Sequence, residues 1–176
     1  MTIHHSYVRR SLVHALAFWL VAVAAAGAAV AGETLVGPAR VVDGDTLEIS
    51  GRTVRLIGIL APAIDQKCQR DGQDWPCGRK AADRMQELIA GRPVRCLAAG
   101  RDSDGATAGL CFAGGLELNR ALVADGYAVA RHWVGLDYDE TEETAKAARL
   151  GIWSGSFTDP EAWRARHASA EAKPAS

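Results

Sequence analysis

Two aspartates in one tight turn are the first residues of this chain that could do chemistry. Asp43 and Asp45 lie in the stretch VVDGDTLEI, where Asp-Gly is a common hairpin signal. Two carboxylates close together at the end of a strand are typical of a cation site or of acid–base chemistry; the alternative is that they are only turn residues. The stretch expected to form the other wall of such a site, LIGILAPA at residues 56–63, carries no polar side chain.

Short strands and turns must position these aspartates. Between Val36 and Ile59 the pattern predicts three strands, within ARVV, DTLEI and RTVRLIGI, separated by turn signals at Asp43-Gly44 and Ser50-Gly51. Residues 61–77 are predicted to be a loop. Apolar residues at helical spacing then predict a helix within GRKAADRMQELIAG.

The second half of the chain adds two strands and further helices. The strands are predicted in RPVRCLA and over about residues 107–113, and the helices in ELNRALVADG and in the acid-first segment DETEETAKAARLG. This order suits an α+β protein built on a small closed β-barrel of the OB type, with five strands and about three added helices. From Arg164 onward we expect a mobile, alanine-rich end.

The N-terminal segment has the features of a secretory signal. Arg9 and Arg10 precede the apolar run LAFWLVAVAAAGAAV, and an A-x-A cleavage site ends at Ala31. The alternative is an uncleaved membrane anchor, because the apolar run approaches a membrane-spanning length; a twin-arginine signal fits the flanking residues poorly. We therefore predict a signal peptide over residues 1–31, one domain over 32–156 and a C-terminal tail over 157–176. The processed protein is expected in the periplasm or secreted, without stable membrane insertion.

The charge balance argues against a protein whose function depends on binding nucleic acid through its phosphates. Loss of Arg9 and Arg10 reduces the 20 basic residues to 18, against 21 acidic residues, so the net charge changes from −1 to −3. Proteins that hold nucleic acid through its phosphates usually show a basic excess. Nucleic-acid binding is therefore predicted to be weak or absent, and no other partner can be identified from the residues.

Four cysteines behind a secretory signal predict two disulfides, with three possible pairings. Cys96 and Cys111 lie in two predicted strands joined by a short polar segment, which favours a cross-strand bond between them. Cys68 and Cys77 would then close a short loop. The alternative is a four-cysteine zinc site, although the chain has no C-x-x-C pair.

The order of motifs from about Val36 to Trp153 resembles the thermonuclease, or staphylococcal-nuclease-like, family. The matching stretches are VVDGDTLEI, VRLIGILAP, CGRKAADRMQELIAGRPVRC, ELNRALVADGYAVA and TAKAARLGIW. The cysteine-bearing loop that ends in WPCG is similar to a secreted bacterial branch of that family. The resemblance implies an OB-fold barrel and, in active members, calcium-dependent hydrolysis of phosphodiesters in DNA and RNA.

Only part of the family's functional set is present at the matching positions. The resemblance makes Asp45, with Asp43 as its neighbour, a retained calcium-ligand position and Arg55 a retained phosphate contact. It places Leu60 where a second calcium ligand is expected, Ala63 where a general base is expected and Ala106 where a second phosphate-binding arginine is expected.

These replacements predict a catalytically inactive homologue that acts as a binding module and needs no cofactor. The alternative is a calcium-dependent nuclease with a rearranged site, for which Asp65 and Asp104 are the nearby acids. Without a metal we expect Arg55 to pair with Asp45 across the strands. His132 and Trp133 form a possible ligand face; the alternative is a strand end at which Trp133 covers the core.

Overall fold

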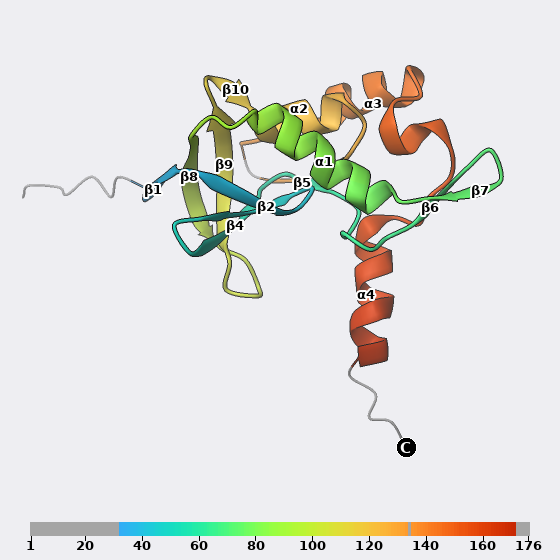
Figure 1. Ribbon diagram of the computed structural model, residues 1–176, viewed down its shortest axis with the longest axis horizontal. Helices are drawn as coiled ribbons and strands as arrows, with labels where there is room; N and C mark the ends of the chain where they lie inside the picture. The colour runs from blue at the N-terminus through green and yellow to red at the C-terminus, as the bar shows by residue number, and fades with distance from the viewer. Residues whose placement is uncertain (1–31, 134, 172–176) are drawn as a thin grey trace, which may run out of the picture. The chain divides into compact units, whose positions relative to one another are not determined.

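The computed structural model describes residues 32–133 and 135–171, and Figure 1 shows their arrangement. The predicted signal peptide over residues 1–31 lies outside these described residues. None of the described helices is long and apolar enough to cross a membrane.

One mixed sheet positions the candidate site. Its strands follow the order β1-β8-β9-β4-β3-β2, with the short β10 paired to β9. Neighbouring strands are antiparallel except for the parallel pair β4–β9. The strands of this sheet are β1 (Thr34–Gly37), β2 (Ala39–Asp43), β3 (Thr46–Ile49), β4 (Arg52–Leu56), β8 (Val94–Arg101), β9 (Thr107–Ala113) and β10 (Leu116–Glu117).

The predicted α+β class and the strands around the aspartate turn are present, but the predicted closed barrel of five strands is not. The sheet has seven strands, and among the described residues no pairing between its edge strands β1 and β2 closes it. The extra strands are short: β1 precedes β2 with only Pro38 between them, and β10 has two residues. Proline lacks the backbone N–H that a ladder needs, so it separates β1 from β2.

Two small sheets lie beside the main one. They pair β5 (Ile59–Leu60) with β11 (Val129–Ala130), and β6 (Cys68–Arg70) with β7 (Gln73–Trp75). The hairpin β6–β7 lies inside residues 61–77, which were predicted to be a loop. Its turn contains Asp71-Gly72 with φ angles of 53° and 76°, so the Asp-Gly hairpin signal was present in the sequence.

Four α-helices occur within the described residues instead of the predicted three or so. They are α1 (Cys77–Ile89), α2 (Leu118–Ala124), α3 (Asp139–Ala147) and α4 (Pro160–Glu171), and a 3₁₀ helix, η1 (Gly151–Ser154), precedes the last of them. The helix α4 occupies the segment predicted to be mobile from Arg164 onward (Figure 1). Asp159 explains the difference, because its Oδ1 accepts the backbone N–H groups of Glu161 and Ala162 at the start of this alanine-rich helix.

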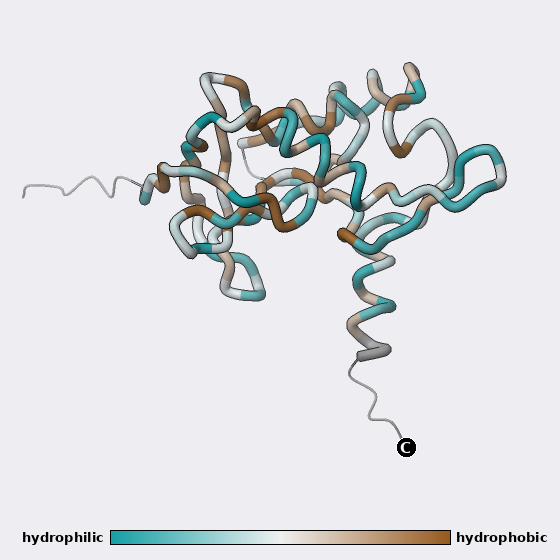
Figure 2. Tube along the Cα trace, in the orientation of Figure 1, coloured by the Kyte–Doolittle hydropathy of each residue, from teal (hydrophilic) through white to brown (hydrophobic). Residues whose placement is uncertain are grey.

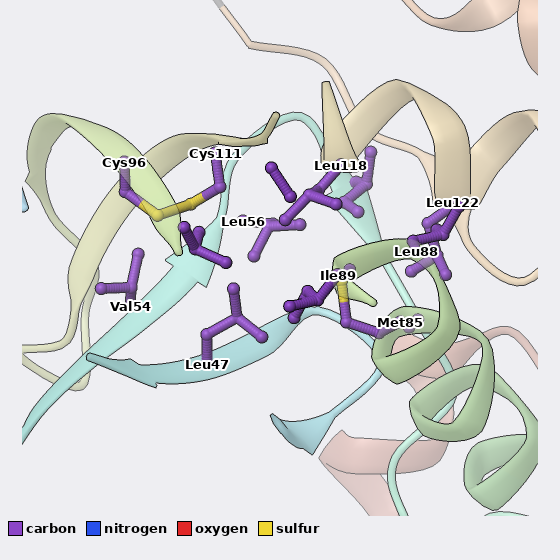
Figure 3. Close-up of a cluster of buried hydrophobic side chains, with 14 of the residues drawn as sticks. Leu47, Val54, Leu56, Met85, Leu88, Ile89, Cys96, Cys111, Leu118 and Leu122 are labelled. Carbon is purple, nitrogen blue, oxygen red and sulfur yellow. A yellow bond between two sulfur atoms is a disulfide. The ribbon is translucent and has the colours of Figure 1, made fainter. Parts of the chain in front are cut away.

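The main core lies between the sheet and the helices α1 and α2. Figure 3 shows Leu47 and Leu56 from the sheet between Val54, near the Cys96–Cys111 disulfide, and Met85 and Ile89 of α1. All five side chains are buried, and the apolar stripe of α1 is the one that its helical spacing predicted. Figure 2 shows that polar residues are concentrated on the outer segments, including the β6–β7 turn.

Both predicted disulfides are confirmed. Cys96 of β8 bonds to Cys111 of β9, which is its direct partner in the strand register, and Cys68 bonds to Cys77. The second bond belongs to a smaller hydrophobic cluster with Val129 and Ile152. That cluster joins the β6–β7 hairpin to the C-terminal part of the chain.

Candidate active-site cleft

The turn between β2 and β3 brings the two predicted aspartates together. A register shift between Val41 and Asp43 marks a bulge at the end of β2. The Oδ1 atom of Asp43 accepts the backbone N–H of Asp45 at 3.1 Å. The bulge and this bond hold the two carboxyl groups on one side of the turn.

Asp45 is completely buried and has partners on both carboxylate oxygens. Its side chain is 0% exposed, its Oδ1 accepts the Thr46 hydroxyl at 3.0 Å and its Oδ2 accepts the Ala61 backbone N–H at 2.6 Å. Ala61 belongs to the apolar stretch LIGILAPA, so this stretch does form the opposite wall of the aspartate site. It contributes a backbone donor to the site where the family resemblance led us to expect a side-chain ligand.

A guanidinium from the end of the chain lies beside both aspartates. The Nη2 atom of Arg164, on α4, is 3.4 Å from Oδ2 of Asp45 and 3.6 Å from Oδ2 of Asp43. Sequence reasoning missed Arg164, because it assigned the segment to a mobile tail. The Pro160 and Asp159 signals of a helix start could have identified the helix, but not where it packs.

The protonation of Asp43 reflects its crowded position. Burial, and then the charge of Asp45 and their hydrogen bond, raise the pKa of Asp43 to about 7, although Arg164 favours the ionised form. Desolvation and a neighbouring like charge both disfavour a carboxylate. Near neutral pH the pair therefore carries less than two negative charges.

The predicted pair between Arg55 and Asp45 does not form. Arg55 pairs instead with two acids of the β8–β9 loop. Its Nη1 atom lies 2.7 Å from Oδ2 of Asp102 and 2.8 Å from Oδ2 of Asp104. In the β3–β4 register Arg55 faces Thr46, not Asp45, and Asp45 is bonded to Ala61. Burial lowers the pKa of Arg55, but the hydrogen bond to Asp104 and the charges of the nearby aspartates raise it overall.

Asp102 also organises the loop in which the second phosphate-binding arginine was expected. Its Oδ1 accepts the backbone N–H groups of Asp104 and Ala106, at 3.0 Å and 2.9 Å. Ala106 lines an open cavity of about 400 Å³ with Arg55 and Asp104. A negative charge therefore stands beside Arg55 on the loop from which the family resemblance predicts a positive one.

Leu60 and Ala63 have no polar side-chain atoms, and both are packed against other parts of the chain. Leu60 packs against the small cluster that contains the Cys68–Cys77 disulfide and Ile152. The Ala63 carbonyl accepts the Gln66 backbone N–H at 2.8 Å and lies so close to Gly78 that a Cβ there would collide with it. Asp65, two residues further on, is exposed.

His132 and Trp133 lie in a different hollow from Arg55. With Arg131 and Tyr138 they line a cavity of about 280 Å³ that shares no lining residue with the one beside Arg55. His132 is exposed and Trp133 half-buried. The structure therefore does not bring this possible ligand face together with the retained phosphate position.

The charged groups of the cleft do not assemble into a metal site in the structure. Within residues 32–133 and 135–171, no three His, Cys, Asp or Glu side chains gather in a way that could hold a metal ion. Asp43 and Asp45 are two acids, and calcium usually takes six to eight oxygen ligands. The opposing wall presents Leu60, whose side chain offers no oxygen.

Comparisons with known proteins agree with the resemblance seen in the motifs. The sequence profile of the family described as "Staphylococcal nuclease homologue" matches residues 53–155. The chain is 42% identical over 128 residues to the "Succinoglycan biosynthesis protein ExoI" of Rhizobium meliloti, a match that covers 70% of this chain and 66% of that protein, slightly less than two thirds. It is 32% identical over 137 residues to an "Uncharacterized endonuclease" of Escherichia coli, covering 73% of this chain and 82% of that protein.

Proposed function

The chain belongs to the staphylococcal nuclease homologue family, and from this premise we propose that it is an exported homologue that has lost phosphodiester hydrolysis. In this proposal it serves as a binding or interaction module in the periplasm. The observation that carries the proposal is that Asp45 and Arg55, the two retained positions, are each engaged by charged groups of the protein itself.

The three replaced positions support the loss of catalysis. Leu60 has no side-chain oxygen for a hard cation, and the methyl group of Ala63 cannot accept a proton from an attacking water. General acid–base catalysis typically contributes ~10²–10⁴ in rate. Ala106 supplies no charge to a phosphoryl group, a role in which an arginine contributes ~10³–10⁵ in nucleotide-hydrolysing enzymes. Losses within one catalytic unit do not multiply, but any one of them would leave a poor nuclease.

The remaining arginine is also poorly placed to bind a phosphate. A phosphodiester would have to displace Asp102 and Asp104 from Arg55 or bind beside their negative charges. The acidic balance of the processed chain adds a general repulsion toward nucleic acid. Both effects support a binding role for a ligand other than the nucleic-acid backbone.

The direct test is a cleavage assay on oxidised protein purified from the periplasm of an expression host. Single-stranded DNA and RNA are incubated with Ca²⁺ and, in parallel, with a chelator. We expect no calcium-dependent cleavage by the unmodified protein. Cleavage that requires calcium and is lost in Arg55→Ala would contradict the proposal.

A triple reversion, Leu60→Asp with Ala63→Glu and Ala106→Arg, serves as the matched variant in this assay. It restores the residue types that the family resemblance implies, while Arg164 still lies beside Asp45. If this variant cleaves nucleic acid and the unmodified protein does not, the three replaced positions account for the loss of activity.

A second candidate is a calcium-dependent nuclease that works through a rearranged site. It is favoured by the name of the Escherichia coli relative, an endonuclease. Asp65 and Asp104 were the acids considered for such a site. Asp65 is exposed on its loop and Asp104 is bonded to Arg55, so neither stands free beside Asp45.

For the binding role, the Rhizobium relative suggests a class of partner. Its name refers to the biosynthesis of succinoglycan, which points our proposal toward the assembly of an exported polysaccharide. Deletion of the gene followed by measurement of exopolysaccharide tests this part separately. An unchanged amount of exopolysaccharide would contradict a role in polysaccharide assembly. It would not affect the prediction that the protein has no nuclease activity.

A further inference from the structure

We propose that Arg164 is a built-in cation for the aspartate site: its guanidinium takes the place that a divalent cation would occupy and keeps such ions out. The inference does not require the protein to be inactive toward nucleic acids. It concerns which positive charge neutralises Asp43 and Asp45, and it is tested by metal binding rather than by cleavage.

The geometry around Asp45 carries the inference. A carboxylate that is 0% exposed needs hydrogen bonds and a counter-charge. Thr46 and Ala61 supply neutral donors. The positive group that contacts both aspartates is the guanidinium of Arg164, whose Nη2 atom lies within 3.6 Å of each of them; Arg55 interacts with Asp45 only through its charge, without a direct contact.

The guanidinium is partly buried at this position. The Arg164 side chain is 30% exposed, yet its Nη1 atom is buried and has no hydrogen-bond partner in the described part of the chain. Arginine keeps its positive charge under all ordinary conditions. A charge held in this way lowers the affinity of the aspartates for any additional cation.

Three separate contacts fix the segment that delivers Arg164. Ser156 exchanges two backbone hydrogen bonds with Gln69 of β6, and the buried Gln66 donates its side-chain amide to the Thr158 carbonyl at 2.7 Å. Asp159, which caps α4, pairs with Arg131 at 2.6 Å. The position of Arg164 is therefore set by the fold and not by the attraction to the aspartates alone.

The apolar wall of the cleft takes part in the same arrangement. Leu60 packs against the cluster that includes Ile152, and Trp153 and Phe157 pack against that cluster as well. The side chain at the position of the missing metal ligand and the segment leading to α4 therefore pack against the same small hydrophobic cluster.

Ion binding to two single variants tests the proposal. The oxidised protein, Arg164→Ala and the control Arg166→Ala are titrated with Ca²⁺ by calorimetry and with Tb³⁺ by luminescence. Arg166 lies exposed on the same helix, so its removal changes the net charge equally. We expect Arg164→Ala to bind either ion at least roughly tenfold more tightly than the unmodified protein, while Arg166→Ala resembles the unmodified protein.

Two further variants keep the result interpretable. Adding Asp45→Asn to Arg164→Ala should abolish the gained binding, which assigns it to the aspartate site. Arg164→Gln removes the charge with a smaller change in size and replaces the alanine variant if that variant does not fold. Binding by Arg164→Ala and Arg164→Gln no tighter than by the unmodified protein would overturn the proposal, as would an equal gain in Arg166→Ala.

Hydrogen exchange provides a second readout. Without the Arg164 contacts, the amides of α4 should exchange faster in Arg164→Ala than in Arg166→Ala. Addition of Ca²⁺ should leave this exchange unchanged, because the new ion replaces the charge but not the link to the helix. Identical exchange in the two variants would contradict a role of Arg164 in holding α4 to the aspartate site.

Discussion

Asp45 and Arg55 carry charges of opposite sign, and each is neutralised by groups of the chain itself. On one side, the buried acid Asp45 is neutralised by Arg164, which lies 119 positions away in the sequence. On the other side, Arg55, 35% exposed, is neutralised by Asp102 and Asp104, which are 47 and 49 positions away. The two arginines are similarly exposed, but Asp45 is completely buried whereas Asp104 is 66% exposed. The first contact depends on the C-terminal helix and the second on a loop.

This difference in burial predicts a difference in energy. Breaking a buried charge pair leaves an uncompensated group that water cannot reach, whereas exposed pairs are screened and contribute little. The aspartate side is therefore expected to support the stability of the fold, and the Arg55 side mainly to control what can bind.

The largest expected effect is on the aspartate side. Asp45→Ala removes the acceptor for Ala61 and leaves Arg164 without its buried partner, so the free energy of unfolding should fall by about 3–5 kcal/mol. Denaturant unfolding measures it. As the control, Asp83→Ala removes a half-exposed acid of α1 that pairs with Lys80 and should change stability by less than about 1 kcal/mol. Similar losses in both variants would contradict the comparison.

The second-largest effect on stability is expected from the Cys68–Cys77 disulfide, which belongs to the same hydrophobic cluster as Ile152. Replacing Cys68 and Cys77 by serine should lower stability by about 2–4 kcal/mol and increase hydrogen exchange in α4, because the hairpin that binds Ser156 loses its covalent link. The same replacement at Cys96 and Cys111 should cost a comparable amount without specific loss of protection in α4. Equal exchange in α4 for both variants would show that the helix is held independently of the hairpin.

The pH dependence of stability should differ in sign between the two sides. The folded-state pKa of Asp43 is raised to about 7, so between about pH 4 and 7 the folded state binds a proton that the unfolded chain lacks. The contribution of Asp43 is thus greatest at low pH and is lost as pH rises toward 7. Denaturant unfolding across this range should show a downward slope that is reduced in Asp43→Asn.

Asp104 should act in the opposite direction. Its hydrogen bond to Arg55 lowers its pKa, so its stabilising contribution is present above the unfolded-state pKa, near about 4, and is lost as pH falls below it. Asp104→Asn should leave the slope between pH 4 and 7 unaltered. If the slope disappears in Asp104→Asn and persists in Asp43→Asn, it is caused by Asp104 and not by Asp43.

The smallest effect on stability is expected on the Arg55 side. Asp104→Ala breaks an exposed pair and should leave the free energy of unfolding almost unchanged. It should instead raise the affinity for single-stranded DNA at low salt, since Arg55 loses one competing carboxylate. Fluorescence anisotropy measures this, with Asp74→Ala, which removes another exposed acid, as the control. Equal affinities in the two variants would mean that Asp104 does not mask Arg55.

Local signals in the sequence predicted most of the fold around the cleft. The Asp43-Gly44 and Ser50-Gly51 turns, the apolar stripe of α1 and the pairing of Cys96 with Cys111 each follow from neighbours or from a repeating pattern. The partners of Arg55 were not predicted, because the strand register and the conformation of the β8–β9 loop determine which of the nearby acids it contacts.

The role of Arg164 could not be predicted for a stronger reason. Its contact with Asp45 joins residues 119 positions apart and depends on where a whole segment packs. An alanine-rich helix with charged residues has no pattern that indicates a buried contact. The closed barrel was predicted from strand number, while closure depends on how the edge strands β1 and β2 meet.

Thermal unfolding of the oxidised protein with Ca²⁺ and with a chelator tests whether Asp45 and Arg55 are already neutralised by counter-charges of the chain. A ligand that binds only the folded state raises the melting temperature. We predict the same melting temperature in both conditions for the unmodified protein. A calcium-dependent increase that disappears in Asp45→Asn would show instead that the aspartates bind a metal ion and that Arg164 does not exclude it.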